Sequence, residues 1–594
     1  MHDLFVKFSI LCCLVSYGES ARILGVFPMS AGSHYILDYK LMKGLADAGH
    51  DVIMLTPYKQ ENPPKTKGNY TEIILDGFRE SISVSYGESA RILGVFPISS
   101  GSHYILDYKL MKGLADAGHD VTMITPFKQK NLPKTKGNYT EIILDGFEES
   151  MSAREKNTDM FKLSKLNMAV MMSAMIGMFG KHMNDTLHHP KVRALLSSNE
   201  KFDAIIVEPI MTDIMKIFPI VFNCPVILLF SLGPNSWINP SVGNPQEISY
   251  ARHMYYTGNN EVPMTFFGRI INLLYHVYDY LFNKFYYLPL CNKVLQKAYP
   301  GATPNTKTRY TNASLVLLNS HTSLYPAHPL VPNMVEIGGY HVDPPGKLPK
   351  DLQEFLDNAK DGAIYFSMGS NLKSKLMSEE RKKMILNVLG RLKQKVIWKF
   401  EEELPGKPDN VLIKKWLPQQ DILAHPNIKL FITHGGLLST TETVYHGVPI
   451  LAIPVFGDQP ANAEKAQYAG YAIKLGYHDD NFTEENFEKY ILELLNNPKY
   501  RENAQRRSKL FHDRPMKPMD TAVYWVEYVI RNNGARHLRV AGADQAWYEY
   551  HLVDVALFLL ASLVVVFEIS KFVIKKVFLV AKSKLSPKKK LKTK

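Results

Sequence analysis

Cysteine is scarce in this sequence, and its scarcity excludes the disulfide-rich and zinc-binding classes of small protein. Only 4 of the 594 residues are cysteine, and none stands at a spacing typical of a metal-ligand motif. Cys12 and Cys13 fall in an apolar N-terminal segment, which leaves Cys224 and Cys291 for a single bridge that the sequence neither requires nor forbids. We therefore expect no disulfide framework and no metal site.

Acidic residues are missing from the C-terminal end, where ten lysines lie between Lys571 and Lys594. These lysines supply ten of the +13 net charges, so the rest of the chain is close to neutral. A nucleic-acid partner, which a basic protein would otherwise suggest, is therefore not expected. Apolar residues make up 46% of the chain, which excludes a mainly disordered protein, and 594 residues are too many for one core.

The first 20 residues are typical of a secretory signal peptide. Lys7 lies in a short polar start, the run from Leu4 to Val15 is mostly apolar, and small residues precede a cleavage site near Ala21. A buried first strand is the weaker interpretation, because the residues that follow already read as that strand. Five glycosylation triplets fit a lumenal glycoprotein: Asn69, Asn138, Asn184, Asn312 and Asn481.

Residues 552–574 predict a transmembrane helix, because this segment approaches the roughly 20 apolar residues that a bilayer requires. Trp547 and Tyr548 suit one membrane interface, and the Lys-rich tail 575–594 suits the cytosolic side. Residues 590–594 resemble the lysine-based retrieval signals of endoplasmic reticulum membrane proteins. We expect a single-pass type I protein of that membrane with its body in the lumen. A buried core helix and a plain anchor for anionic lipid are the alternative interpretations of helix and tail.

Residues 15–83 and 84–152 are near copies of each other. Each copy predicts a strand, a Gly-Ser-His turn, a helix ended by Gly49 or Gly118, and a second strand, which together form one βαβ unit. Two copies are too few for a solenoid, and only one of them fits the first strand of a single sheet. We take the second copy as the working unit, because it is continuous with the downstream chain, and residues 21–83 as an extra copy.

The remaining chain predicts two α/β domains, 84–335 and 336–535, which meet in the Pro-rich stretch 325–349. Short apolar runs such as 202–208 are typical of buried parallel strands. The aromatic-rich helical stretch 264–299 is expected mainly to pack in the core, and lining an apolar ligand pocket is its other interpretation. We predict an α/β fold of two Rossmann-like domains that face a cleft, where such sheets bind ligands.

A candidate anion site follows the strand that is predicted to end at Thr433. His434 and two glycines come next, and a helix starts near Leu437. Backbone N–H groups at a helix start bind anions with help from the helix dipole, and His434 adds a donor. Taken alone, such a turn is as often structural as functional.

The residues around this turn resemble the signature of the UDP-glucuronosyl and UDP-glucosyl transferases, and the resemblance runs from about Ala90 to the basic tail. The sequence His-Gly-Gly-Leu-Leu-Ser is similar to that of invertebrate, insect-type members, which often use UDP-glucose. Leu438 stands where plant and vertebrate members commonly have Asn, so one phosphate or sugar contact does not carry over. The matching positions are Trp416, Gln419, His434, Ser439, Glu442, Asp458 and Gln459.

The resemblance implies a donor site and a two-domain GT-B glycosyltransferase architecture. It also implies that no cofactor or metal is needed. From uracil to sugar, the implied contacts are Trp416 and Gln419 for the nucleoside, Glu442 for the ribose, Ser370, His434, Gly436 and Ser439 for the diphosphate, and Asp458 and Gln459 for the sugar hydroxyls.

His103 stands at the position of the family's catalytic His, after the first strand of the second copy. Imidazole suits a general base, because its pKa near neutrality lets it take a proton from an acceptor hydroxyl. The family pairs this His with an Asp, and Glu208 occupies that position here. A carboxylate there fixes the imidazole tautomer and stabilises the imidazolium. The implied reaction is a direct, metal-free displacement that inverts the anomeric carbon.

The partners implied by the resemblance are UDP-glucose or UDP-glucuronate, a small lipophilic acceptor and the lipid bilayer, and a homo-oligomer is compatible with it. The first alternative is a catalytically impaired UDP-sugar-binding paralogue, in which the extra copy disturbs the acceptor domain. A sugar-nucleotide or lipid transporter is the second alternative, but one membrane span cannot form a transport path.

Overall fold

The computed structural model divides into two compact units, Met1–Ser89 and Ala90–Lys594. The expected signal peptide, Asn312 and the end of the basic tail lie outside the residues that it describes. The described residues are 22–26, 32–56, 65–74, 89–147, 160–164, 168–256, 264–300, 313–370 and 372–585.

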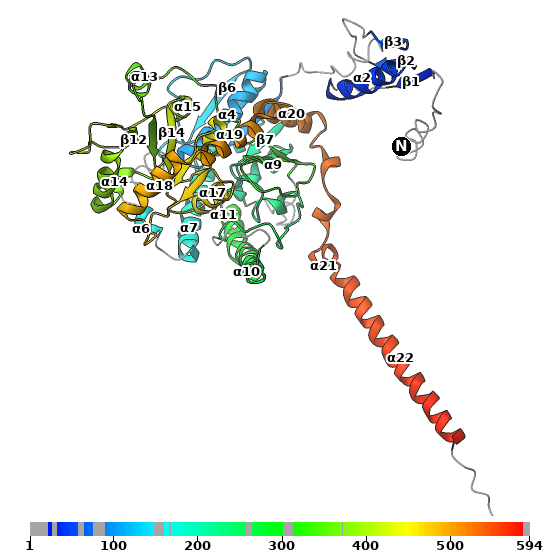
Figure 1. Cartoon of the computed structure of the whole chain (residues 1–594). Coiled ribbons are helices and arrows are strands. Elements are labelled where there is room, and N and C mark those ends of the chain that lie inside the picture. Colours follow the sequence, from blue (N-terminus) through cyan, green and yellow to red (C-terminus); the bar gives the residue numbers. More distant parts are fainter. Residues whose placement is uncertain are drawn as a thin grey trace, which may run out of the picture. The chain divides into compact units, whose positions relative to one another are not determined.

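The first unit holds the first copy of the repeat, drawn in dark blue in Figure 1. Its strands form a parallel sheet in the order β1-β2-β3, so β1 pairs along one edge only within the described residues. Its buried core is small and contains Met42, Ala46, Val52 and Met54. The elements are β1 (Arg22–Val26), α2 (Gly32–Asp47), β2 (Asp51–Thr56) and β3 (Tyr70–Ile74).

The second copy of the repeat supplies three strands of a seven-stranded parallel sheet with the order β10-β9-β8-β7-β4-β5-β6. The chain steps outward from β4 in one direction and then returns to β7 on its other side, which is a doubly wound topology with a switch point between β4 and β7. The strands are β4 (Arg91–Val95), β5 (Asp120–Thr125), β6 (Tyr139–Ile143), β7 (Ala204–Val207), β8 (Val226–Phe230), β9 (Leu315–Leu318) and β10 (Met334–Glu336).

Helices flank this N-terminal sheet, and the first of them ends as the sequence predicts, at Gly118 with a φ of +111°. A π-helical turn, η3, joins two of the later helices. The helices are α4 (Gly101–Ala117), α6 (Met160–Leu163), α7 (Met168–His188), α8 (Pro190–Leu196), η1 (Asp213–Lys216), α9 (Ile217–Val221), η2 (Asn239–Ser241), α10 (Phe266–Phe282), η3 (Asn283–Tyr287) and α11 (Leu288–Ala298).

A second doubly wound sheet of six parallel strands, in the order β13-β12-β11-β14-β15-β16, forms the C-terminal domain. Its switch point lies between β11 and β14. The elements are α13 (Lys350–Asp357), β11 (Ala363–Ser367), η4 (Ser374–Leu376), α14 (Glu379–Arg391), β12 (Lys395–Lys399), β13 (Val411–Lys414), α15 (Gln419–Ala424), β14 (Ile428–Thr433), α16 (Leu437–His446), β15 (Ile450–Ala452), α17 (Gln459–Tyr468), β16 (Ala472–Lys474), α18 (Glu484–Asn496) and α19 (Pro498–His512).

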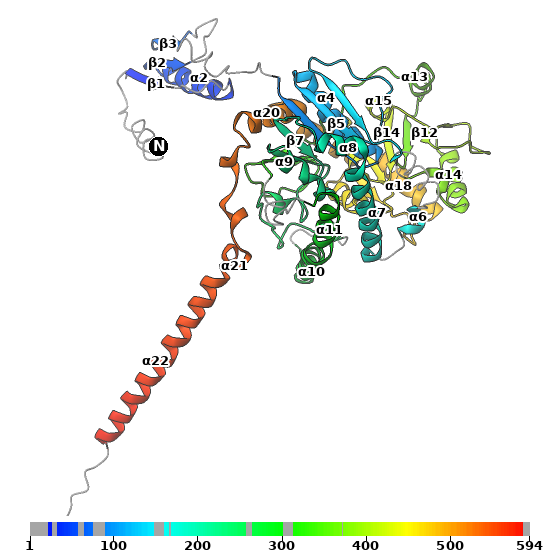
Figure 2. The same ribbon diagram turned by 180° about the vertical axis from the view of Figure 1, so that it is seen from behind.

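The chain crosses back to the first domain in α20 (Pro518–Arg531), beside α4 in Figures 1 and 2. Ala522 and Val526 are buried in the same apolar cluster as Ile92 of β4. The boundary at 535 that the sequence suggests assigns α20 to the C-terminal domain. The helix packs instead in the core of the N-terminal domain. An apolar stripe shows that a helix is buried, but it does not tell which sheet covers it.

The aromatic residues of α10 are divided between the core and the surface: Tyr275 and Phe282 pack against the core of the N-terminal domain, whereas others are exposed. Phe266, Phe267 and Tyr280 are exposed, and none of the described residues 264–299 lines the cleft between the domains. The expectation of core packing therefore holds for part of this segment, such as Tyr287 and Tyr299, and the pocket-lining alternative is wrong. The buried positions of α10 are polar or small instead: Gly268, Asn272 and Asp279.

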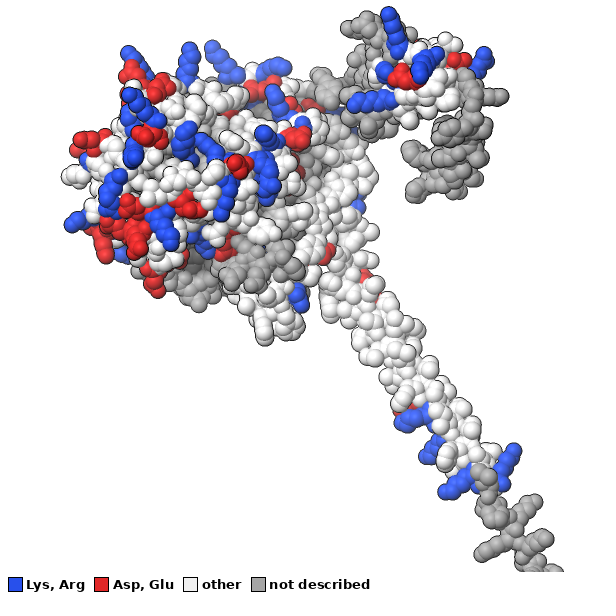
Figure 3. Space-filling view, viewed as in Figure 1, with Lys and Arg blue, Asp and Glu red and all other residues white. Residues whose placement is uncertain are grey.

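The C-terminal end forms a long apolar helix, α22 (Val553–Leu585), which follows η5 (Arg536–Leu538), η6 (Ala541–Asp544) and α21 (Trp547–Tyr550). Its length and composition suffice to cross a membrane, and its side chains are exposed. Figure 3 shows its first half almost uncharged, with charged side chains, mostly Lys, along its second half. The helix contains the predicted span 552–574 apart from its first residue and continues into the basic tail. Cys224 is a free thiol, so the possible bridge between Cys224 and Cys291 is not formed.

Candidate active site

A cavity of about 910 Å³ lies between the two domains of the second unit. Loops that follow β4, β7 and β8 line it from one side, and loops that follow β11, β14 and β15 line it from the other. These are the carboxyl ends of parallel strands, where doubly wound sheets bind ligands next to their switch points. All eleven site residues predicted from the sequence line this cavity apart from Glu208, which lies behind His103.

His103 and Glu208 form a hydrogen-bonded pair at the switch point of the N-terminal sheet. His103 lies in the first turn of α4, and Glu208 directly follows β7. The distance from His103 Nδ1 to Glu208 Oε1 is 2.5 Å. The Glu208 side chain is 1% exposed and that of His103 is 24% exposed. The buried carboxylate of Glu208 therefore holds Nδ1 of His103 in place. Nε2 is the ring nitrogen that is available to a ligand.

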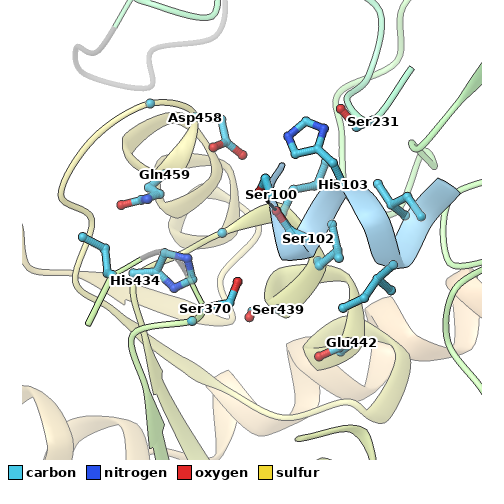
Figure 4. Close-up of a pocket in the computed structure, with 18 of the residues that line it drawn as sticks. Ser100, Ser102, His103, Ser231, Ser370, His434, Ser439, Glu442, Asp458 and Gln459 are labelled. Carbon is cyan, nitrogen blue, oxygen red and sulfur yellow. Dashed lines mark hydrogen bonds between the residues drawn. The ribbon is translucent and has the colours of Figure 1, made fainter. Parts of the chain in front are cut away.

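The pKa of His103 lies above its usual value. Burial alone would lower it, but the charge and hydrogen bond of Glu208, together with the charge of Asp458, outweigh burial. Figure 4 shows the imidazole on α4 and the Asp458 carboxyl at the start of α17, on opposite sides of the pocket. A base with a raised pKa holds a transferred proton more firmly, and it loses that proton at higher pH than an ordinary histidine does.

A second buried acid, Asp107, lies one helical turn beyond His103 on α4. Burial and the charge of Glu208 raise the pKa of Asp107 well above its usual range. One oxygen of Asp107 and one of Glu208 have no hydrogen-bond partner in the part of the chain that is described. Sequence reasoning missed this residue, although its i, i+4 spacing from His103 was a signal.

The turn after β14 has the geometry of an anion site. Gly435 has a φ of +79°, and Gly436 precedes the first residue of α16, so backbone N–H groups of the helix start face the cavity edge. His434 is partly buried, and this burial together with the charge of Lys399 lowers its pKa to about 4. His434 is therefore neutral near pH 7 and contributes an N–H donor rather than a charge.

The nucleoside end of the site is a connected hydrogen-bond network. Gln419 Nε2 donates to Ser439 Oγ at 3.0 Å and to Glu442 Oε2 at 2.5 Å, and Gln420 Nε2 donates to Glu442 Oε1 at 3.0 Å. Burial raises the pKa of Glu442, while the two amide donors act in the opposite direction. The network holds the buried carboxyl group of Glu442 in place. The lone pairs of its oxygens can accept hydrogen bonds from two neighbouring hydroxyl groups.

Trp416 presents an open aromatic face at this end, with 71% of its surface exposed. Lys399 Nζ lies 4.8 Å from the centre of the indole ring and donates to the Gly369 carbonyl at 2.8 Å. Lys399 ends β12 and, with Lys373, lines the same region of the cavity. Neither lysine was identified from the sequence. A lysine at the carboxyl end of a parallel strand was the available signal.

Asp458 and Gln459 begin α17 on the side facing His103. Asp458 Oδ2 accepts from Asn462 Nδ2 at 2.6 Å, and burial raises the pKa of Asp458. Gln459 Oε1 accepts from the backbone N–H groups of Val455 and Phe456. The Gln459 oxygen therefore shapes its own loop, and only its amide N–H₂ remains for a ligand.

The rest of the cavity on the N-terminal side is apolar. Its lining contains aromatic and aliphatic side chains with few charges, and it continues directly from His103. A small lipophilic molecule fits such a surface. The residues are Phe179, Ile210, Met211, Phe230, Leu232, Trp237, Met254 and Tyr255.

Two doubly wound domains face the cavity. One wall carries an anion site and a nucleoside platform, and the other carries a His–carboxylate pair. Together these features define the class of nucleotide-sugar transferases. A family model described as UDP-glucoronosyl and UDP-glucosyl transferase matches residues 91–590. UDP-glycosyltransferase UGT5 of Dactylopius coccus is 37% identical over 491 residues, which cover 81% of this chain and 91% of that relative.

UDP-glucuronosyltransferase 2B19 of Macaca fascicularis is 32% identical over 536 residues, which cover 83% of this chain and 94% of that relative. The crystal structure of CalG4, the calicheamicin glycosyltransferase, aligns with a TM-score of 0.52 at 16% identity over 75% of this chain and 99% of that one, which shows the fold alone.

The chain belongs to the UDP-glucuronosyl and UDP-glucosyl transferase family, and it is a hexosyltransferase. The family and the GT-B fold predicted from the sequence are thereby confirmed.

Proposed function

We propose that the chain transfers glucose from UDP-glucose to a hydroxyl group of a small lipophilic acceptor, with inversion at the anomeric carbon and with His103 as the general base. The observation that carries this proposal is the His103–Glu208 pair, which lies across the cleft from Asp458 and beside the apolar half of the cavity. Release of UDP from UDP-glucose in the presence of a phenolic acceptor tests the activity. A chain that binds UDP but forms no UDP from UDP-glucose with any acceptor would contradict the proposal.

The reaction proceeds in one displacement. The acceptor hydroxyl gives its proton to His103 Nε2 while its oxygen forms a bond to the anomeric carbon. The bond between that carbon and the UDP oxygen breaks, and its electron pair leaves with UDP. Glu208 stabilises the imidazolium that results. The backbone N–H groups at the start of α16, with the neutral His434, stabilise the charge on the departing diphosphate.

We also propose that α22 spans the bilayer of the endoplasmic reticulum and that the body of the enzyme lies in the lumen. The exposed apolar surface of α22 and the lysines at its end support this orientation. The sequons that are described fit the same compartment.

Donor selectivity follows from the charges of the cleft. UDP-glucose is expected to exceed UDP-glucuronate in kcat/KM by at least about tenfold, the equivalent of about 1.4 kcal/mol of repulsion between a glucuronate carboxylate and Asp458. No arginine is present among the described residues that line the cavity, and its lysines lie toward Trp416. Competition between the two donors at equal concentration measures the ratio. A preference for UDP-glucuronate contradicts this assignment.

The activity is expected to fall at acid pH as His103 becomes protonated. Because Glu208 raises the pKa of His103 in the folded enzyme, the acid limb of kcat/KM lies above the usual histidine range. In Glu208→Gln the negative charge is lost, so the limb moves to lower pH while the maximal rate also falls. The pH profile of UDP release measures both effects.

A matched control for the pH profile is Asp116→Asn, which removes an exposed acid paired with Lys112 at the far end of the same helix. Its profile should equal that of the unchanged enzyme. An acid limb that stays in place in Glu208→Gln would mean that another group, not His103, sets the limb.

The alternative of an impaired paralogue is not favoured by this geometry. The second copy completes the seven-stranded sheet by itself, and His103 and Glu208 meet at its switch point. The pair that the chemistry needs is therefore intact in the second unit.

A further inference from the structure

The helix α10 has its polar and apolar faces reversed relative to a surface helix of a water-soluble domain. Such a helix normally buries its apolar stripe and exposes polar residues. Here the buried positions are polar or small, as noted above, and the exposed ones are large and apolar. The exposed set continues into η3 and contains Phe266, Phe267, Ile270, Ile271, Leu273, Leu274, Val277, Tyr280, Leu281, Phe285 and Tyr286.

Hydrogen bonds fix this orientation. Asn272 Oδ1 accepts from the backbone N–H of His253 at 2.7 Å, and Asn272 Nδ2 donates to the carbonyls of Ile248 and Ala251 at 2.7 and 2.9 Å. A helix rotated to bury its apolar face would take Asn272 away from three backbone partners. The present orientation is therefore the one that the polar groups require.

Asp279 makes a second set of buried contacts on the same face. Its Oδ2 accepts from Ser236 Oγ at 2.6 Å and Trp237 Nε1 at 3.0 Å, and it lies 2.7 Å from His253 Nε2. Trp237 also lines the acceptor half of the cavity. The polar face of α10 is thus bonded to the wall of the acceptor pocket, and its apolar face points away from that wall.

The exposed charges on α10 and η3 are all of one sign. Asp279 is the only acid between residues 264 and 300, and it is buried. Lys284 Nζ lies over the rings of Tyr280 and Phe285, and Arg269 lies over Phe266. Apolar and aromatic side chains with a few cations at their edge are the pattern of a helix that lies in a membrane interface. In Figure 3 the surface where α10 lies is mostly uncharged.

We infer that α10 is a second membrane contact, which lies in the plane of the bilayer interface with its apolar face among the lipids. This inference rests on the proposal that α22 spans the bilayer. The segment from Arg531 to Val553, which joins the body to α22, is short, so the anchor keeps α10 at a high effective concentration near lipid.

A second copy of the chain fits this face less well than lipid. A two-fold contact through α10 would bring Arg269 and Lys284 of both copies to one apolar surface, and the helix offers no exposed acid to pair with them. Phospholipid headgroups supply the missing negative charge on every side.

Depth measurements on the full chain in phosphatidylcholine–phosphatidylserine vesicles test the inference. A nitroxide label is placed on cysteine at Leu274 of α10, Leu560 of α22 or Tyr468 of α17, in a chain whose own cysteines are replaced by alanine. The three side chains are each 60% exposed, so they differ in location and not in accessibility to solvent. Relaxation by oxygen reports lipid, and relaxation by a water-soluble nickel chelate reports water. Retained UDP-sugar turnover shows that each variant is folded.

We expect the labels at Leu274 and Leu560 to show a several-fold higher ratio of oxygen to nickel relaxation than the label at Tyr468. A lipid-like Leu560 with a water-like Leu274 would overturn the role of α10 and leave the anchor intact. Water-like values at both positions would reject the anchor and the inference together, without touching the sugar-transfer proposal. Spin–spin broadening at Leu274 that disappears on dilution with unlabelled chain would show a second copy instead of lipid.

Discussion

Replacing His103 by alanine is expected to lower kcat by about 10²–10⁴-fold, the usual contribution of a general base. The acceptor hydroxyl then has to lose its proton to water, and Glu208 is left buried without its partner. Donor binding should be little affected, because His103 belongs to the acceptor wall of the cleft. Initial rates of UDP release together with the Kd for UDP, measured by calorimetry, separate the two effects.

The duplicated sequence provides the control for this variant. His34→Ala makes the same change at the corresponding position of the first copy, in α2 of the other unit, and it should leave kcat unchanged. A chain that lacks residues 22–88 should be equally active. If activity instead survives in His103→Ala and is lost in His34→Ala, the first copy is the catalytic one.

Gly369→Ala is expected to weaken UDP binding by at least about tenfold, the equivalent of about 1.4 kcal/mol. Gly369 follows β11 with a φ of +82°, and a Cβ there would come 2.5 Å from Cε1 of His434. The imidazole has to move from its position beside Gly369 and Gly436, so the donor N–H and the turn around Gly436 are displaced together. Calorimetric titration with UDP measures the loss.

Gly406→Ala separates the steric effect from backbone strain. Gly406 has a similar φ of +75°, but no atom lies within 4 Å of a Cβ built there. This variant should lose about 1 kcal/mol of folding stability, the cost of a left-handed conformation for alanine, and should keep full affinity for UDP. Equal losses of UDP affinity in the two variants would show that strain, not the contact with His434, is responsible.

The strands and the donor site were predictable from sequence because their signals are local. Buried parallel strands read as short apolar runs, and the turn at His434 has the order strand, glycines, helix within a few residues. The pairing of His103 with Glu208 was expected from a family resemblance, and the doubly wound topology explains it physically. Both residues follow strands that are neighbours at the switch point, although 105 positions separate them.

The features that sequence reasoning missed depend on contacts between distant segments. Asp107 and Lys399 become site residues only through the packing of their elements, and α20 is covered by a sheet that ends long before it in the chain. For α10 the error had a different cause. Its aromatic residues were assigned mainly to the core because apolar side chains are normally buried from water, and this helix exposes several of them, among them Phe266, Phe267 and Tyr280.

Among the described residues β1 is paired along one edge only, and this affects how readily the first copy can change in sequence. In the second unit the corresponding edge, that of β4, is covered by β7, and the complete sheet carries the catalytic pair. The first copy has no such partner strand among its described residues, and its described core contains four buried side chains. Substitutions there meet few constraints from packing or chemistry. We therefore expect the first copy to accept substitutions more readily than the second copy, and the two copies differ at positions such as Ile53 and Thr122.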